Sequence, residues 1–175
     1  MLRYLAVYTV GKLVAWPIRR RLRAFDRLTR EPQRVQEQLL REFVALHADT
    51  QFGRDHGFST IKSVADFRKQ VPVAPYEYVQ PYIEKVQRGE TRALLTDSKV
   101  LMFALTSGTT ASRKYIPVTP RYLADYRRGW NMWGLRTFRD HKGVSFRPIV
   151  QLAGDPDEMR TEAGIPCGSI SGFTT

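Results

Sequence analysis

The amino-acid sequence predicts an α/β fold, and three observations support this prediction. Apolar residues recur every three to four positions after Pro32 and after Pro120, which is typical of helices with one buried side. Two apolar runs of strand length, residues 99–105 and 115–118, enclose a loop rich in glycine and hydroxyl residues. The composition, with 42% hydrophobic and 26% charged residues over 175 positions, excludes a disordered or fibrous chain. We therefore expect one domain-sized core, or part of a larger one.

The first expected helix spans residues 34–47, after Pro32 in a position suited to a first helical turn. Its predicted buried side consists of apolar residues three to four positions apart: Val35, Leu39, Phe43 and Leu46. Residues 48–63 are rich in glycine and polar side chains, so we expect them to form a loop.

Two further helices are expected before the first strand. Ser63 followed by Asp66 is typical of a capping box, which starts a short helix that ends before Pro72. Residues 76–88 are expected to form the next helix, with Gly89 as its terminating residue.

The two predicted strands are expected to form a hairpin, after which Thr119 caps and Pro120 opens the longest helix of the chain. An apolar stripe on this helix is expected to be core; it consists of Leu123, Tyr126, Trp130, Trp133 and Phe138. Residues 144–153 are expected to contain a further strand, and the Gly- and Ser-rich tail, residues 164–175, no closing element.

Net charge separates the N-terminus from the rest of the sequence. The chain has 28 basic and 17 acidic residues, a formal net charge of +11. Residues 1–30 hold eight basic residues and Asp26, which gives +7, whereas residues 31–175 hold 20 basic and 16 acidic residues, which gives +4. We therefore predict a basic N-terminal helical arm, residues 1–30, and a nearly balanced body, residues 31–175. No nucleic-acid partner is expected for such a body.

The arm allows two interpretations. Lys12 interrupts its apolar run and Pro17 ends it, so the run is too short to span a bilayer, which takes about 20 apolar residues. One interpretation is an amphipathic helix on an anionic membrane, with Tyr8 and Trp16 at the interface. The other is a helix that packs an apolar side against the domain and leaves the arginines of residues 19–23 in solvent.

The most informative segment is FALTSGTTASRKYIPVT, residues 103–119. Its hydroxyl groups and the backbone N–H groups around a glycine can donate hydrogen bonds to phosphate oxygens, and its lysine adds a positive charge. The residues predicted to contact phosphate are Thr106, Ser107, Gly108, Thr109, Thr110 and Lys114. The loop is not a Walker A motif, because Arg113 stands where the second glycine would be.

The pattern TSGTT…K-x-x-P-V-T resembles the first signature of the acyl-adenylate-forming superfamily, a loop that holds the triphosphate of ATP. Three segments look like the start of proteins of the auxin-responsive GH3 family, the acyl acid amido synthetases. They are FGRDHGF, DFRKQVPVAPYEYVQPYIEKVQRGE and LLTDSKVLMFALTSGTT, at residues 52–58, 66–90 and 94–110. The resemblance extends from about Leu39 to Arg128 and does not explain residues 1–30.

This resemblance implies the N-terminal part of the large domain of an adenylate-forming, acyl-CoA synthetase-like fold. It implies an enzyme that uses ATP and Mg²⁺ to adenylate a carboxylic acid and then transfers the acyl group to an amine or an amino acid. The residues of the loop from Thr106 to Thr110 and Lys114 match the phosphate-contacting positions of the family. The protein is expected in the cytoplasm, with its arm as a weak contact to anionic membranes.

The sequence departs from the family pattern in two ways. Ala111 stands where a glycine commonly follows the second threonine, which changes the backbone freedom of the loop tip. The signatures that bind adenine and ribose do not occur before Thr175, so no catalytic residue is assigned and the chain alone is expected to be inactive. A piece of a longer amido synthetase is therefore one expectation. The alternative is a non-catalytic remnant of the fold that binds a membrane or another anion.

No metal site is predicted from side chains. The three histidines share no metal-ligand spacing with the single cysteine, Cys167, which is expected to be a passive thiol. An acidic turn formed by Asp155, Asp157 and Glu158 is expected to be solvated.

Overall fold

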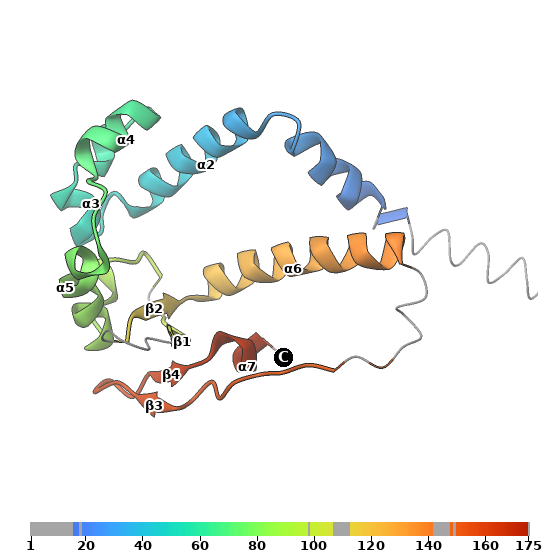
Figure 1. Ribbon diagram of the computed structural model, residues 1–175. Coiled ribbons are helices and arrows are strands. Elements are labelled where there is room, and N and C mark those ends of the chain that lie inside the picture. The colour runs from blue at the N-terminus through green and yellow to red at the C-terminus, as the bar shows by residue number, and fades with distance from the viewer. Residues whose placement is uncertain are drawn as a thin grey trace, which may run out of the picture. The chain divides into compact units, whose positions relative to one another are not determined.

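The structure is a computed structural model that describes residues 16–17, 19–97, 99–106, 113–141, 148 and 150–174 (Figure 1). The chain divides into two compact units. The first comprises Met1–Gln36 and Tyr126–Pro148, and the second comprises Glu37–Asp125 and Ile149–Thr175. Mixed helices and a small sheet confirm the predicted α/β class.

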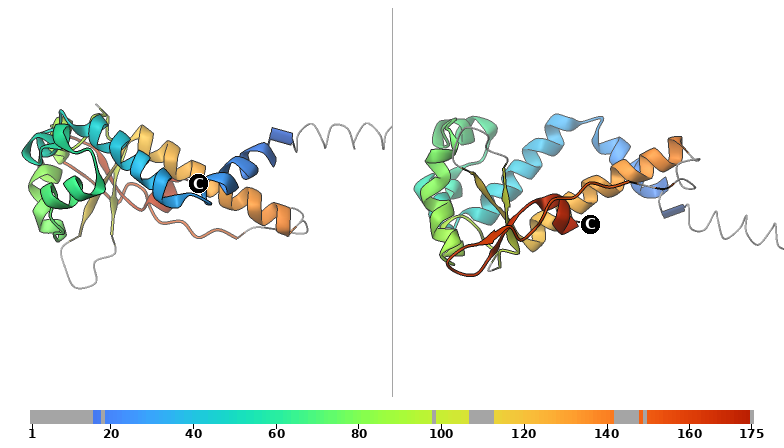
Figure 2. Two further views of the ribbon diagram at one scale, coloured as in Figure 1. Left: turned by 90° about the horizontal axis from the view of Figure 1, so that it is seen from above. Right: turned by 60° about the horizontal axis from the view of Figure 1, so that its bottom comes forward.

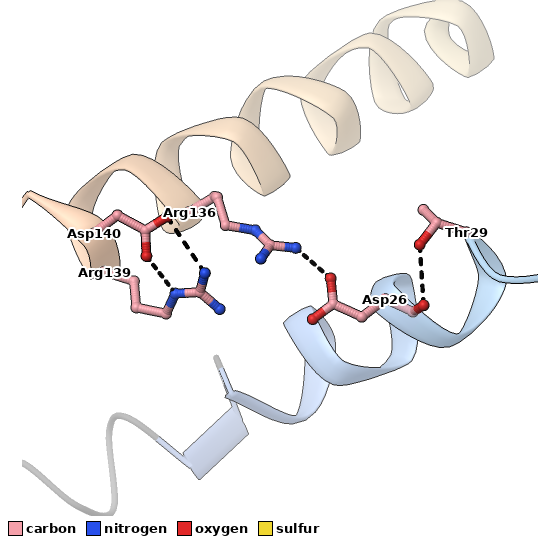
Figure 3. A network of polar contacts seen from close by, with 5 residues as sticks. All are labelled: Asp26, Thr29, Arg136, Arg139 and Asp140. Atoms are coloured by element: carbon pink, nitrogen blue, oxygen red, sulfur yellow. Dashed lines mark hydrogen bonds and ion pairs between the residues drawn. The ribbon is translucent and has the colours of Figure 1, made fainter.

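The first unit is helical in its described part. It contains the helical residues 19–28, the first turn of α2 (Pro32–His47) and the later turns of α6 (Pro120–Asp140). Arg136 of α6 forms an ion pair with Asp26 of the N-terminal helix (Figure 3). Leu22 is buried, whereas the arginines of residues 19–23 are exposed. The apolar side that the packed interpretation places against the domain, Leu5, Val10, Leu13 and Val14, lies outside the described residues.

The second unit begins with the end of α2 and a series of short helices. They are α3 (Gln51–Asp55), the 3₁₀ turn Phe58–Thr60, α4 (Val64–Gln70), α5 (Tyr76–Gln87) and the 3₁₀ turn Thr91–Ala93. The buried cluster of this region consists of Val44, Phe58 and Ile61.

The predicted helix over residues 34–47 is confirmed, but its predicted buried side is wrong. Leu39 and Phe43 are 57% and 56% exposed, while Val44 is buried and Leu40 packs against its cluster. The apolar positions of this helix support two adjacent stripes, and the contacts with Phe58 and Ile61 select the stripe through Leu40 and Val44.

The prediction of a loop over residues 48–63 is also wrong, because this stretch contains α3. Thr50 caps α3 by accepting a hydrogen bond from the Gly53 backbone N–H at 2.9 Å. The predicted cap at Ser63 is confirmed, since its hydroxyl accepts from the Asp66 N–H at 3.1 Å. The terminating role of Gly89 is confirmed by its φ of 97°.

The sheet has four short strands in the order β2-β1-β4-β3 (Figures 1 and 2). Their bounds are β1 Met102–Leu105, β2 Tyr115–Val118, β3 Met159–Arg160 and β4 Pro166–Gly168. The predicted hairpin is confirmed, because β1 and β2 are antiparallel with Leu105 opposite Tyr115. Strand β4 pairs in parallel with β1, with Phe103 opposite Cys167.

Alternate residues of β1 pack into different clusters, as the period of a strand requires. Phe103 lies in a buried cluster with Ile83 and Val86 of α5 and with Cys167. Met102 and Ala104 lie in a second cluster, which includes Leu123 of α6 and contacts from α7 (Ile170–Thr174). The hairpin is thus anchored by packing on both sides of its central strand.

The predictions for the C-terminal region need two corrections. The tail does contain closing elements, β4 and α7. The strand expected at residues 144–153 is absent from the described residues 150–153, and residues 144–147 and 149 lie outside the described part. Segment 154–156 lies close to Gly168 of β4. A Cβ on Gly168 would lie 2.4 Å from the Asp155 carbonyl oxygen, so only a glycine fits at this position.

Helix α6 begins as predicted but does not bury its whole aromatic stripe. The Thr119 hydroxyl accepts from the Tyr122 N–H at 3.1 Å, and Leu123 is buried. Trp130 and Trp133 are 54% and 62% exposed, so the prediction that they are core is wrong. The helical pattern alone does not say how many turns of such a stripe a neighbouring element covers. The side chain of Phe138 lies outside the described part of the chain.

No helix within the described residues is both long enough and apolar enough to cross a membrane.

Candidate phosphate-binding site

The hairpin of β1 and β2 brings the two ends of the predicted phosphate loop together. The Thr106 backbone N–H donates to the Lys114 carbonyl oxygen at 3.3 Å, and the Lys114 N–H lies 3.4 Å from the Thr106 hydroxyl. Residues eight positions apart are therefore held side by side. Ser107, Gly108, Thr109 and Thr110 lie outside the described residues.

Tyr76, the first residue of α5, fixes the strand that follows the loop. Its hydroxyl accepts from the Tyr115 backbone N–H at 3.0 Å and lies 3.3 Å from the Tyr115 carbonyl oxygen, to which it donates. Strand β2 is an edge strand, so its outward backbone groups have no neighbouring strand to bond with. One phenol group thus satisfies both backbone groups of Tyr115 next to the end of the loop.

The same tyrosine contacts the predicted phosphate-binding lysine. The Lys114 ammonium lies 5.7 Å from the centroid of the Tyr76 ring, within the range of a cation–π contact. Partial burial raises the pKa of Tyr76, which keeps its phenol neutral and able to donate. Sequence reasoning missed Tyr76, because a contact across 39 positions has no local pattern.

A second basic side chain at this end of the loop is tied to the acidic turn. Arg113 forms an ion pair with Glu158 at 3.2 Å. Asp157 of the same turn pairs with Arg160. The turn is therefore exposed but not merely solvated, because two of its carboxylates have arginine partners. Lys114 faces an aromatic ring instead of a carboxylate in the contacts that the described residues record.

The other candidates of the sequence do not form a site. Cys167 is fully buried, and burial raises the pKa of its thiol, which fits a passive role. His56 is buried and contacts the Tyr78 hydroxyl at 2.5 Å, so it belongs to the packing of α3 on α5. The described residues contain no group of three or more His, Cys, Asp or Glu side chains able to hold a metal ion.

The described ends of the predicted phosphate loop carry hydrogen-bond donors and basic side chains. The Thr106 hydroxyl lies at one end. At the other end, the Lys114 ammonium lies over the Tyr76 ring and the Arg113 guanidinium is paired with Glu158. Such groups suit a polyphosphate better than a neutral ligand, because they donate hydrogen bonds and carry positive charge.

The chain is similar to proteins of one family. Residues 21–175 match the GH3 family N-terminal domain. The chain is similar to indole-3-acetic acid-amido synthetase GH3.8 of Oryza sativa subsp. indica, with 35% identity over 98 residues, 55% of this chain and 16% of that protein. It is also similar to jasmonoyl-L-amino acid synthetase GH3.3 of Oryza sativa subsp. japonica, with 33% identity over 93 residues, 53% of this chain and 20% of that protein.

A solved structure shows the same fold. The GH3.15 acyl acid amido synthetase superimposes with a TM-score of 0.74 and 21% identity, over 87% of this chain and 28% of that protein. The chain thus spans less than a third of the length of the relatives it matches. Because the family match covers most of its residues, the chain belongs to the GH3 family, of which it carries the N-terminal domain.

Proposed function

We propose that this chain is the phosphate-loop part of an ATP-dependent acyl acid amido synthetase. The observation that carries the proposal is the anchored hairpin, which holds Thr106 and Lys114 across the mouth of the loop. The names of two GH3 relatives, an indole-3-acetic acid-amido synthetase and a jasmonoyl-L-amino acid synthetase, support the reaction class.

The proposed reaction has two steps. A carboxylate oxygen of the acyl acid attacks the α-phosphorus of ATP, the bond to the bridging oxygen breaks, and pyrophosphate leaves. An amine then attacks the acyl carbon, AMP leaves, and the nitrogen loses a proton. A carboxylate is a poor electrophile, and adenylation gives it a good leaving group.

The loop would act on the leaving pyrophosphate. The negative charge on pyrophosphate grows as its bond to the α-phosphorus breaks. Hydrogen-bond donors that the fold already holds in position stabilise that charge without reorganisation. Lys114 would supply a positive charge, and the hydroxyl groups of residues 106, 107, 109 and 110 would supply donors. Tyr76 would position Lys114 and the strand behind it without touching the nucleotide.

Mg²⁺ would accompany the triphosphate. In nucleotide sites this ion is commonly held by substrate phosphates and one or two carboxylates, so it requires no dedicated protein cage. When bound, it would neutralise phosphate charge. The hydroxyl and ammonium groups at the hairpin mouth fit a phosphate ligand, and the chain's own residues are proposed to contact phosphate and not the metal.

The proposal includes a division of labour along the chain. Residues 1–30 form a basic arm, and residues 31–175 belong to the catalytic body. The acyl acid, ATP and an amine or amino acid are the proposed small-molecule partners. The cytoplasm is the proposed location, which the single buried free thiol of Cys167 suits.

Acid-dependent exchange between ATP and pyrophosphate tests the proposal in the full-length protein that carries this chain. Lys114→Ala and Ser107→Ala should each lower exchange by about 10²-fold or more, the scale of losing one transition-state donor. Lys62→Ala is the matched control, because Lys62 is an exposed lysine of the same unit away from the hairpin. Equal exchange in all variants would remove the loop from the mechanism.

Tyr76→Phe separates positioning from contact in the same assay. It keeps the ring under Lys114 but loses the hydroxyl that bonds Tyr115. We expect a higher KM for ATP with a smaller change in kcat, because the loop is less well ordered. An unchanged KM would show that this anchor does not serve the site.

A further inference from the structure

The excess positive charge of the chain is confined to one of its two units. By sequence, the first unit holds 15 basic and three acidic residues, a net charge of +12. The second holds 13 basic and 14 acidic residues, a net charge of −1. The charge is therefore not only a feature of the first 30 residues. Residues 126–148, more than 90 positions away, add six basic residues to the same unit.

Among the described residues of the first unit, arginines outnumber carboxylates. These residues include 11 arginines and three carboxylates, an excess of eight positive charges. Each carboxylate already has an arginine partner: Asp26 pairs with Arg136, Glu31 with Arg34, and Asp140 with Arg139. The Asp26 pair joins the N-terminal helix to α6, so the basic residues of both helices belong to one body (Figure 3).

Exposed aromatic side chains accompany this charge. All three tryptophans of the sequence, Trp16, Trp130 and Trp133, lie in the first unit. They are 59%, 54% and 62% exposed. Phe25 and Leu28 of the N-terminal helix are also exposed. An indole is costly to leave in water and is favoured at the boundary between lipid headgroups and acyl chains.

We propose that the first unit is a docking surface for an anionic phospholipid bilayer, formed jointly by the N-terminal helix and the later turns of α6. Arginines attract acidic headgroups, and tryptophans enter the interface. The surface does not depend on the proposed catalytic function. A nucleic acid is the less favoured partner, because phosphate contacts alone would not use exposed apolar residues such as Phe25 and Leu28.

The tryptophan distribution makes the test direct. Intrinsic tryptophan emission of the chain reports on the first unit alone, because the second unit contains no tryptophan. The chain would be mixed with vesicles of phosphatidylcholine, with or without about 30 mol% phosphatidylglycerol. We expect co-sedimentation and a blue shift of emission with the anionic vesicles only. Binding should fall as salt rises from about 0.05 M to about 0.5 M.

Brominated phosphatidylcholine in the anionic vesicles should quench the emission of the wild-type chain, because a quencher on the acyl chain must approach the indoles. This measurement needs no variant, so a folding defect cannot obscure it. Sedimentation without quenching or blue shift would overturn the role of the tryptophans.

Two pairs of substitutions assign the surface. Trp130→Ser with Trp133→Ser, and Arg21→Gln with Arg27→Gln, should each weaken vesicle binding by about tenfold. The matched control is Arg68→Gln with Lys69→Gln, which removes the same charge from exposed positions of α4 in the second unit and should leave binding within about twofold. Equal losses in control and test variants would overturn the proposal. So would displacement of the chain from vesicles by a single-stranded oligonucleotide at equal phosphate concentration.

Discussion

The two units of this GH3 domain use aromatic side chains in opposite ways. In the second unit, Phe52 stacks on His56 with ring centroids 3.9 Å apart, and Phe103 meets Tyr115 edge-on. Phe52 packs against the cluster of Val44, Phe58 and Ile61, and Phe103 and Tyr115 pack against α5. In the first unit, the ring centroids of Trp130 and Trp133 are 5.2 Å apart, yet both side chains are more than half exposed.

Net charge also differs between the two units. The second unit is nearly neutral, and Arg113 at the end of the candidate loop pairs with Glu158. The first unit carries the excess. We propose that one unit fixes the geometry of a loop and the other presents a surface, so substitutions of the same kind should have different consequences in each.

The largest difference is expected for a phenylalanine in each unit. Phe103 is fully buried in the central strand, and Phe103→Ala should lower the free energy of unfolding by about 3–5 kcal/mol, because it leaves a cavity. Phe25 is 44% exposed in the first unit, and Phe25→Ala should cost less than about 1 kcal/mol. Urea denaturation of the chain measures both. Similar losses would show that the exposed residues of the first unit are packed as tightly as the core.

The sequence predicts those features of the fold that depend on residues close together in the chain. Signals confined to a few residues predict the structure correctly: the caps at Ser63 and Thr119, the helix stop at Gly89, and the hairpin of two short strands. These depend on bonds between residues close in the chain, so their pattern is printed in the sequence.

Features that depend on distant partners were not predicted. The three-residue strand β4 exists because it pairs with β1, more than 60 positions earlier. The buried stripe of α2 was misassigned because the helix pattern does not say which side its neighbours cover. In the site, the loop ends were predicted, but Tyr76 was not, since its bonds to Tyr115 follow from the packing of α5 on an edge strand.

Replacing one glycine in each unit by alanine should change the free energy of unfolding in opposite directions, by smaller amounts. A Cβ on Gly168 would lie 2.4 Å from the Asp155 carbonyl oxygen and 2.6 Å from a Pro156 backbone carbon. Gly168→Ala in the second unit should therefore lower stability by about 1–3 kcal/mol, because backbone must move. Gly129 has nothing within 4 Å of its added Cβ and lies inside α6. Gly129→Ala should raise stability by about 0.5–1 kcal/mol through helix propensity.

Thermal and urea unfolding of both glycine variants would be compared with the wild-type chain. A neutral Gly168→Ala would mean that segment 154–156 is not held against β4. A destabilising Gly129→Ala would mean that the exposed side of α6 at this position contacts another part of the protein.

The smallest expected effect concerns the polar link between α3 and α5 in the second unit. The Tyr82 hydroxyl donates to Asp55 at 2.8 Å. Desolvation, followed by this hydrogen bond to the carboxylate, raises the pKa of Tyr82 to about 12. At neutral pH, Tyr82→Phe should cost only about 0.5–1.5 kcal/mol, the net value of one such hydrogen bond.

The pH dependence of the same link has a definite sign. The folded state favours the neutral phenol, whereas the unfolded chain loses this proton near pH 10. The stability that Tyr82 contributes is therefore fully present below about pH 10 and is lost as the pH rises toward about 12.

The urea concentration at the midpoint of unfolding, measured between about pH 10 and 12, should fall less steeply in Tyr82→Phe than in the wild type. Asp55→Asn, which keeps an acceptor but removes the charge, should give an intermediate slope. Identical slopes in all three proteins would show that the hydroxyl of Tyr82 is not held by Asp55. The alkaline sensitivity of the second unit would then come from other groups, such as Tyr76 and Cys167, whose pKa values burial also raises.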